Sequence, residues 1–130
     1  MVTDPISNML TSIRNAQVVK QLSIDVPFST LKYEIAKILQ KNGFITQVEK
    51  KGKKNKKFIE IILKYNNGVA TISGIKRISK PGQRIYVSVK EIRKVKSGYG
   101  LAIISTPRGL MTNTEARKNN LGGEVICEIW

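Results

Sequence analysis

The residues of this chain best suited to binding chemistry lie in a short polar turn at positions 105–109. The surrounding segment, 98–112, reads Gly-Tyr-Gly-Leu-Ala-Ile-Ile-Ser-Thr-Pro-Arg-Gly-Leu-Met-Thr. Apolar residues at 101–104 and 110–111 predict two short strands around the turn. The turn offers two hydroxyls, one guanidinium, backbone N–H groups and a glycine that allows close approach. It holds no nucleophile beside a base, so we interpret it as a tip that contacts RNA.

The charge of the chain predicts a polyanionic partner. Lysine and arginine number 23 against 9 aspartate and glutamate residues, which gives a formal net charge of +14 over 130 residues. Nucleic acid is the first such partner to consider, and an anionic membrane surface is the second. Positions 76–117 hold ten basic residues and two acidic ones, and this run flanks the turn at 105–109 on both sides. The positive charge and the predicted tip coincide, which favours nucleic acid.

The composition argues against catalysis, metal binding and a membrane location. The chain has no histidine, and its single cysteine, Cys127, cannot complete a thiolate zinc site or an internal disulfide. No pair of carboxylates is placed for acid–base chemistry, and no phosphate-binding glycine loop is complete. No run reaches the roughly 18 apolar residues of a membrane helix, and positions 1–5 lack the pattern of a signal peptide. We therefore predict a cytoplasmic protein with a buried thiol and with no catalytic residue, metal or cofactor.

The first half of the chain carries the pattern of a small α+β lobe. Positions 4–17 have apolar residues at helical spacing, and a second helix follows Ser29 or Thr30 and stops at Asn42-Gly43. Strands are predicted at 22–26, 44–48, 58–65 and 69–75. The residues predicted to face the core are Ile6, Met9, Leu10, Ile13 and Ala16 in the first helix, Leu31, Ile35, Ile38 and Leu39 in the second, and Leu22, Ile24 and Val26 in the first strand.

A dense cluster of lysines lies between two of these strands. Positions 50–57 hold six lysines in eight residues, so we interpret them as the tip of a β-hairpin. Like charges at this density repel one another unless they are solvated or paired. The tip is either a mobile, solvated loop or an electrostatic contact to phosphate, and the two interpretations are compatible.

The predicted fold class is α+β in two small lobes. Residues 1–75 hold two helices and a three- or four-strand sheet, and residues 76–130 are mainly β with one short helix and carry the predicted tip. The boundary falls within 75–81, where Pro81-Gly82 predicts a turn. The other elements of the second lobe are a strand at 84–87, a helix that begins at the capping box Thr112–Glu115 and ends near Asn119-Asn120, a break at Gly122-Gly123, and a strand at 124–130 with Val125, Cys127 and Ile129 on one face.

Three polar residues of the first lobe are further candidates for binding. Thr11 and Arg14 lie off the apolar stripe of the first helix, where they form either a solvated face or an edge that faces phosphate. Lys32 lies in the first turn of the second helix, where the helix dipole mildly disfavours a cation. A bound phosphate would offset that cost, which favours a functional interpretation of Lys32.

Four groups of residues, spread from one end of the chain to the other, together carry a family resemblance. They are Asp4-Pro5-Ile6 with Met9-Leu10-Thr11 and Ile13-Arg14-Asn15; Arg77-Ile78-Ser79-Lys80-Pro81-Gly82 with Arg84-Ile85-Tyr86; Ser105-Thr106 with Gly109 and Met111-Thr112; and Leu121-Gly122-Gly123-Glu124. With these stretches, the chain resembles the eighth protein of the bacterial small ribosomal subunit. The resemblance implies a structural protein that binds the central domain of 16S rRNA early in subunit assembly, mainly through its C-terminal lobe.

The resemblance also implies partners and contact residues. The partners would be 16S rRNA, the neighbouring fifth and twelfth proteins of the small subunit, and the messenger of its own operon. The RNA site would be an irregular helix, because the major groove of a regular A-form helix is too narrow for side chains. The implied contact residues are Ser105, Thr106, Arg108, Gly109, Tyr86, Glu124 and Arg84, with secondary contacts from Asp4, Thr11, Arg14, Ser29 and Lys32.

Alternatives remain open for several residues and for the function. The family usually has serine and lysine where this chain has Pro107 and Arg108; proline removes a hydroxyl and a backbone donor, whereas arginine keeps the charge. Glu124 is either a solvent-facing strand residue or a carboxylate that orients an arginine or accepts from RNA. Tyr86 is either a half-buried strand aromatic or a stacking platform. The alternative function is an architectural DNA-binding protein, which would need a recognition helix or an intercalating wedge.

Overall fold

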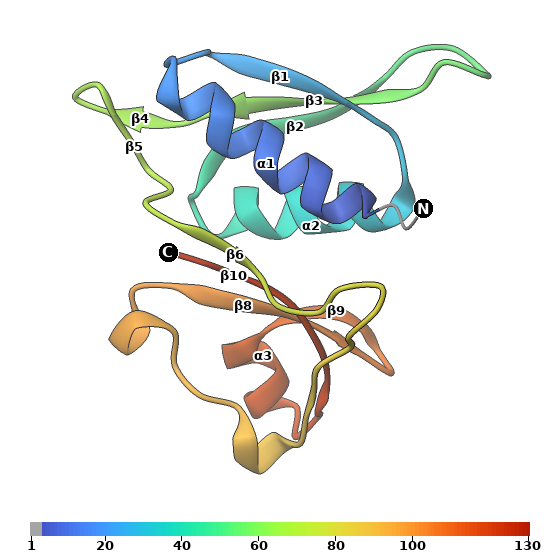
Figure 1. Cartoon of the computed structure of the whole chain (residues 1–130), viewed down its shortest axis with the longest axis vertical. Coiled ribbons are helices and arrows are strands. Elements are labelled where there is room, and N and C mark those ends of the chain that lie inside the picture. The colour runs from blue at the N-terminus through green and yellow to red at the C-terminus, as the bar shows by residue number, and fades with distance from the viewer. Residues whose placement is uncertain (1–3) are drawn as a thin grey trace. The chain divides into compact units, whose positions relative to one another are not determined.

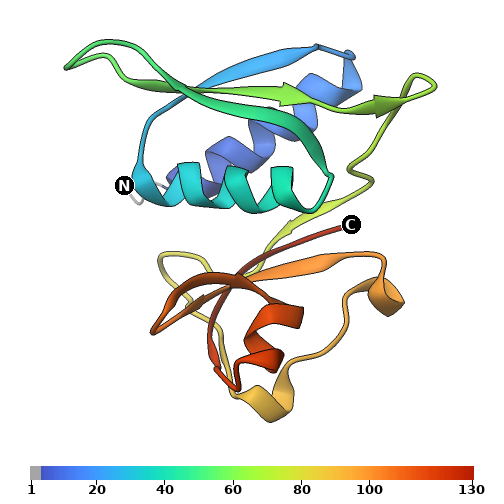
Figure 2. The same cartoon turned by 180° about the vertical axis from the view of Figure 1, so that it is seen from behind.

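The structure, a computed structural model, describes residues 4–130 and confirms the predicted α+β class (Figure 1; seen from behind in Figure 2). The chain divides into two compact units: one is Pro5–Ile72, and the other joins Asp4 to Ser73–Trp130. Residues 1–3, which fall in our predicted N-terminal lobe, lie outside the described residues. Our lobe boundary between 75 and 76 stays a prediction.

In the unit Pro5–Ile72, two helices lie against one face of an antiparallel sheet (Figure 1). The predicted stripe of the first helix is confirmed, since all five of its apolar residues are buried. Alternate residues of the central strand, Ile59, Ile61 and Leu63, are buried as well, as expected for a strand with one face toward the core. The elements are α1 (Pro5–Val18), α2 (Thr30–Lys41), a sheet of order β1 (Ser23–Pro27), β3 (Phe58–Leu63), β2 (Ile45–Lys51), and a ribbon of β4 (Tyr65–Asn66) and β5 (Val69–Ala70).

The lysine-rich segment is the tip of the β2–β3 hairpin, as predicted. Lys51 pairs with Phe58, so positions 52–57 form the connection. Gly52 has a φ of +98°, and a Cβ there would lie 2.0 Å from the Lys56 carbonyl oxygen, so the turn requires glycine. Lys51 bonds Glu60 at 2.8 Å, whereas the side chains of Lys53 and Lys54 point into solvent.

Two predictions about buried side chains in this unit are wrong. Leu22 lies just outside β1 and is exposed. Leu31 is also exposed, whereas Lys32 is only 7% exposed. The reason is the phase of the helix: α2 buries the residues at 32, 35, 36 and 39, which share one helical face, and position 31 lies beside that face.

The predicted strand at 69–75 is also wrong. Only Val69–Ala70 pairs, with Tyr65–Asn66, and Ile75 begins a strand of the other unit. Gly74 explains the change, because its N–H donates to the Trp130 carbonyl oxygen at 2.9 Å and a Cβ at Gly74 would lie 2.3 Å from the Trp130 ring. The contact with Trp130 therefore places the residues from Ile75 onward in the sheet that contains the last strand, β10 (Gly123–Ile129).

The second unit is organised around its last strand, β10, which pairs with three others. The sheet has the order β6-β10-β8-β9, and β7 also pairs with β10. The helix α3 begins at the predicted capping box, in which Thr112 Oγ1 accepts from the Glu115 N–H at 3.2 Å. The elements are β6 (Ile75–Arg77), β7 (Tyr86–Val87), short 3-10 turns at Val89–Glu91 and Lys96–Gly98, β8 (Leu101–Thr106), β9 (Gly109–Thr112), α3 (Asn113–Lys118) and β10 (Gly123–Ile129).

The predicted single face of Val125, Cys127 and Ile129 is wrong. The register of β10 against β8 shifts between Val125 and Cys127, so Ile126 is an extra residue in a β-bulge. A one-residue insertion moves the following side chains to the other face. Val125 consequently packs in the cluster that includes Ala116 of α3, whereas Cys127 and Ile129 lie on the opposite face.

Cys127 should be chemically inert in the folded protein. Its side chain has no exposed surface, and burial raises the pKa of the thiol from 9.0 to about 12. The reactive species is the thiolate, so we expect no alkylation by iodoacetamide at pH 8 in buffer and complete alkylation in guanidinium chloride, measured by mass spectrometry. Rapid alkylation of the native protein would contradict this burial.

Candidate nucleic-acid interface

Three of the residues predicted to bind RNA form one row across the second unit. Tyr86 of β7 pairs with Glu124 of β10, and Glu124 pairs with Ser105 of β8. Ser105 in turn pairs with Leu110 of β9. Directly opposed residues place their side chains on the same face of a sheet. The neighbouring residues Val125 and Ile104 pack in the cluster with α3, so the row lies on the face away from that helix.

Two glycines make this row possible. A Cβ at Gly122 would lie 2.5 Å from the Val87 carbonyl oxygen, and one at Gly123 would lie 2.0 Å from the Ser105 carbonyl oxygen. Real side chains do not tolerate such distances. The start of β10 therefore fits between β7 and β8 because both positions lack a side chain. From the sequence alone, this glycine pair indicates only a break after the helix, and the close approach of the backbones is not predictable.

A buried serine shapes the loop that carries Arg84 and Tyr86. Ser79 has no exposed surface, and its Oγ accepts from the Ile85 N–H at 2.9 Å and donates to the Ile85 carbonyl oxygen at 3.3 Å. The Ile85 carbonyl oxygen also accepts from the Val125 N–H at 2.9 Å. These bonds attach the loop to β10. Sequence reasoning missed this role, although Ser79 belongs to one of the stretches that carry the family resemblance.

The turn differs from the prediction in what it offers to a partner. β8 continues to Thr106, and β9 begins at Gly109, whose φ of +107° requires glycine. Thr106 is 8% exposed, and its hydroxyl donates to the Gly109 carbonyl oxygen at 2.8 Å and accepts from the Arg108 N–H at 3.2 Å. Pro107 has no N–H, and the N–H of Arg108 is already bonded to Thr106. Neither position therefore offers a free backbone donor, in contrast to the prediction. The turn presents the exposed Arg108 side chain, while Thr106 holds its shape.

An ion pair brings Arg84 to the same row. Arg84 Nη1 lies 3.1 Å from Glu124 Oε2, and the two side chains are 49% and 15% exposed. The Arg84 side of the pair is half exposed to solvent, which weakens its contribution to folding stability. Its main effect is to hold the guanidinium next to Glu124, which pairs with both Tyr86 and Ser105 in the row. It also reduces the repulsion that the Glu124 carboxylate would exert on a phosphate group.

Asp4 belongs to the same unit but is held in a separate pair. Arg77 Nε lies 3.1 Å from Asp4 Oδ2, and Arg77 Nη2 donates to Asp4 Oδ1 at 3.4 Å. Arg77 Nη1 also donates to the Ile126 carbonyl oxygen at 2.7 Å, which connects Asp4 to the bulge in β10. These contacts hold the Asp4 carboxylate in place beside β10.

The remaining predicted residues belong to the unit Pro5–Ile72. Thr11 and Arg14 lie on the exposed side of α1. Ser29 caps α2, because its Oγ accepts from the Lys32 N–H at 3.1 Å. The buried Lys32 side chain lines a cavity of about 230 Å³ together with Asn8 and other residues of α1 and β1.

The structure defines a class of protein: a small, basic α+β protein with a row of polar residues across the strands of one sheet. Within residues 4–130, no three His, Cys, Asp or Glu side chains gather to hold a metal, and no helix is long and apolar enough to cross a membrane.

The family is identified by comparison with known proteins. The family described as Ribosomal protein S8 matches residues 4–130. The small ribosomal subunit protein uS8 of Mycoplasmopsis pulmonis is 49% identical over 130 residues, which cover 100% of this chain and 98% of the relative. That of Clostridioides difficile is 51% identical (99% and 98% covered), and that of Thermus thermophilus is 48% identical (100% of both). The chain therefore belongs to the ribosomal protein S8 family, whose members are structural proteins and not enzymes.

Gly123→Ala should disrupt the row. The added Cβ would lie 2.0 Å from the Ser105 carbonyl oxygen, so β10 must move away from β8. We expect a loss of about 1–3 kcal/mol in the free energy of unfolding, measured in urea. Gly82→Ala is the matched control, because no heavy atom lies within 4 Å of its Cβ position. Equal unfolding midpoints for the two variants would show that β10 does not need this close approach.

Proposed function

We propose that this chain is a structural component of the small ribosomal subunit in the cytoplasm and binds the central domain of 16S rRNA. The observation that carries the proposal is the row of Tyr86, Glu124 and Ser105, with Arg84 paired to Glu124 and the exposed Arg108 in the turn that follows β8. This surface combines hydrogen-bonding groups, an aromatic ring and cations. RNA-binding proteins recognise distorted helices by shape and by backbone, ribose and base-edge contacts.

Each residue of the surface has a distinct proposed role. Tyr86 is 68% exposed, so its ring is available to stack on a base or bond a ribose. The Ser105 hydroxyl donates to or accepts from ribose hydroxyls, and the Glu124 carboxylate accepts from ribose hydroxyls and base amino groups. Arg84, oriented by Glu124, and Arg108 at the turn contact phosphates or base edges. Thr106 and Gly109 contribute to binding by shaping the turn that presents Arg108.

Secondary contacts come from residues outside this row. We propose that Asp4, Thr11, Arg14, Ser29 and Lys32 contact RNA, and that the hairpin tip at 50–57 adds an electrostatic contact without sequence preference. The ribosomal neighbours would include the fifth and twelfth proteins of the small subunit. The same surface would bind the messenger of its own operon if that messenger contains a similar distorted helix.

Chemical footprinting of small-subunit rRNA tests the proposal directly. We expect the full-length protein to protect nucleotides of an irregular helix in the central domain, and a regular RNA duplex and duplex DNA to compete poorly at the same salt concentration. Protection spread evenly over the rRNA, or equal competition by duplex DNA, would contradict it.

Tyr86 should contribute directly to RNA affinity. Tyr86→Ala should lower affinity for the protected helix roughly tenfold, because a stacked base is lost. Tyr99→Ala is the matched control: Tyr99 is also exposed, at 87%, but lies before the opposite end of β8. Fluorescence anisotropy measures both. Equal effects of the two variants would show that the row is not the binding surface.

Removing charge from the tip should change the salt dependence and leave selectivity intact. For Lys53→Gln with Lys54→Gln, we expect the slope of log affinity against log salt to decrease by up to about 2, because each phosphate contact contributes roughly 0.7 to 0.9. The preference for the irregular helix over a regular duplex should be unchanged. A loss of that preference would mean that the lysines take part in specific recognition.

A further inference from the structure

The strand β1 presents an unpaired edge in the unit Pro5–Ile72. It is the outer strand of the sheet, and its pairing with β3 is antiparallel. The Leu63 N–H donates to the Leu22 carbonyl oxygen at 2.9 Å, and the Phe28 N–H donates to the Lys57 carbonyl oxygen at 3.2 Å. Hydrogen-bonded and non-hydrogen-bonded pairs alternate along an antiparallel ladder.

This alternation determines which backbone groups face outward. Ile24 and Val26 fall at hydrogen-bonded positions with β3, whereas Ser23, Asp25 and Pro27 fall at the positions between them. The N–H and carbonyl groups of Ser23 and Asp25 therefore point away from the sheet, and among the described residues no hydrogen bond is found to them. Pro27 contributes only a carbonyl, as is usual for a proline in an edge strand.

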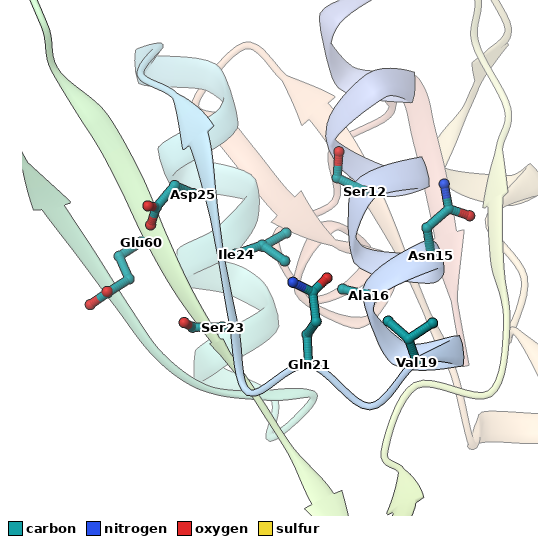
Figure 3. A pocket seen from close by; sticks show the side chains of 9 residues that line it. All are labelled: Ser12, Asn15, Ala16, Val19, Gln21, Ser23, Ile24, Asp25 and Glu60. Atoms are coloured by element: carbon teal, nitrogen blue, oxygen red, sulfur yellow. The ribbon is translucent and has the colours of Figure 1, made fainter.

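A groove runs along this edge. Its volume is about 700 Å³, and its walls come from α1, the segment that follows α1, and both faces of β1 (Figure 3). Ile24 lines it from the face that lies toward the helices, and Asp25 lines it from the opposite face. Both faces of one strand can line the same groove only where the groove passes around the edge of that strand. The groove therefore gives access to the outward groups of Ser23 and Asp25.

The charge of the groove is opposite to that of the chain. Its only charged lining residues are Asp25 and Glu60, which are cross-strand neighbours. Glu49 of β2 is paired with Glu60 on its other side, so three carboxylates lie in a row in a chain of net charge +14. Lys51 contacts Glu49 and Glu60, and no ion pair to Asp25 is found in the described chain. This surface repels phosphate and attracts cations.

Apolar side chains line a different part of the groove from the carboxylates (Figure 3). Val19 lines the groove and is exposed, and Leu22, three residues further along the chain, is also exposed. Such residues offer contact area for an aliphatic side chain of a partner. The groove thus combines backbone donors and acceptors, an aliphatic patch and negative charge.

We propose that the free edge of β1 binds an extended, lysine- or arginine-bearing segment of another protein, which adds to the sheet as a fourth strand. In strand addition, backbone hydrogen bonds supply affinity and alternate side chains supply specificity. Here the segment pairs with Ser23 and Asp25, places its cations near Asp25 and Glu60, and places aliphatic side chains against Val19. This proposal does not depend on the RNA-binding row, which lies in the other unit.

The test uses the full-length, isotope-labelled protein and a blocked peptide of alternating lysine and valine, six residues long. We expect the largest NMR shift changes at the amides of Ser23 and Asp25. A peptide with an N-methyl group on every backbone amide should not bind, because neither of its edges can donate to the outward carbonyl groups of Ser23 and Asp25. Shifts confined to other residues, or equal binding of the methylated peptide, would overturn the proposal.

A pair of charge reversals separates this surface from general electrostatics. Asp25→Lys should weaken peptide binding roughly tenfold, which is a typical effect for a charge facing its partner. Glu34→Lys makes the same change on an exposed residue of α2 outside the groove and should have little effect. Equal losses in the two variants would overturn the proposal.

A single-stranded oligouridylate that shifts the same amides as strongly as the peptide would also overturn the proposal, because RNA would then be the occupant. The rRNA footprint of Asp25→Lys should be unchanged, so failure here is distinguishable from failure of RNA binding.

Discussion

The close approach of β10 to its neighbours is the constraint on which the proposed RNA-binding surface depends. At Gly122 and Gly123 the backbones leave no room for a side chain. This approach makes Tyr86, Glu124 and Ser105 neighbours, although they come from distant parts of the chain. The Ser79 loop and the Thr106 turn then determine how the two arginines beside the row are presented. The surface is thus a product of strand pairing and of local hydrogen bonds, and it does not require a dedicated recognition helix.

The small number of carboxylates explains how one basic chain can carry two surfaces of different character. Nine acidic residues cannot neutralise 23 basic ones, so most cations need a partner outside the chain. Several carboxylates are already engaged inside it: Asp4 with Arg77, Glu124 with Arg84, Glu115 in its capping box, and Glu91, whose pKa is lowered by the hydrogen bond from the Ser88 N–H. Asp25, Glu49 and Glu60 instead gather across one sheet, where they create a local exception to the positive surface.

Features that depend on nearby residues were predictable. The apolar stripe of α1, the capping box of α3 and the lysine hairpin each follow from spacing within a few residues. Predictions failed where a distant segment decided the outcome. Gly74 hydrogen-bonds Trp130, so the segment after it joins the second sheet. Ile126 is the extra residue of a bulge that shifts the register of β10 against β8. The packing of α2 buries Lys32 and leaves Leu31 exposed. None of these contacts leaves a periodic signal in the local sequence.

By itself, the sequence determined the fold class, the excess of positive charge, the family and the segments that carry the proposed binding residues, because these depend on composition and short-range pattern. The tertiary structure alone decided how those segments meet. It brought Tyr86, Glu124 and Ser105 into one row, turned the Thr106 hydroxyl inward to hold its turn, and left the edge of β1 open beside a row of carboxylates. Strand order and register arise from contacts between residues far apart in the chain, so no local pattern specifies them.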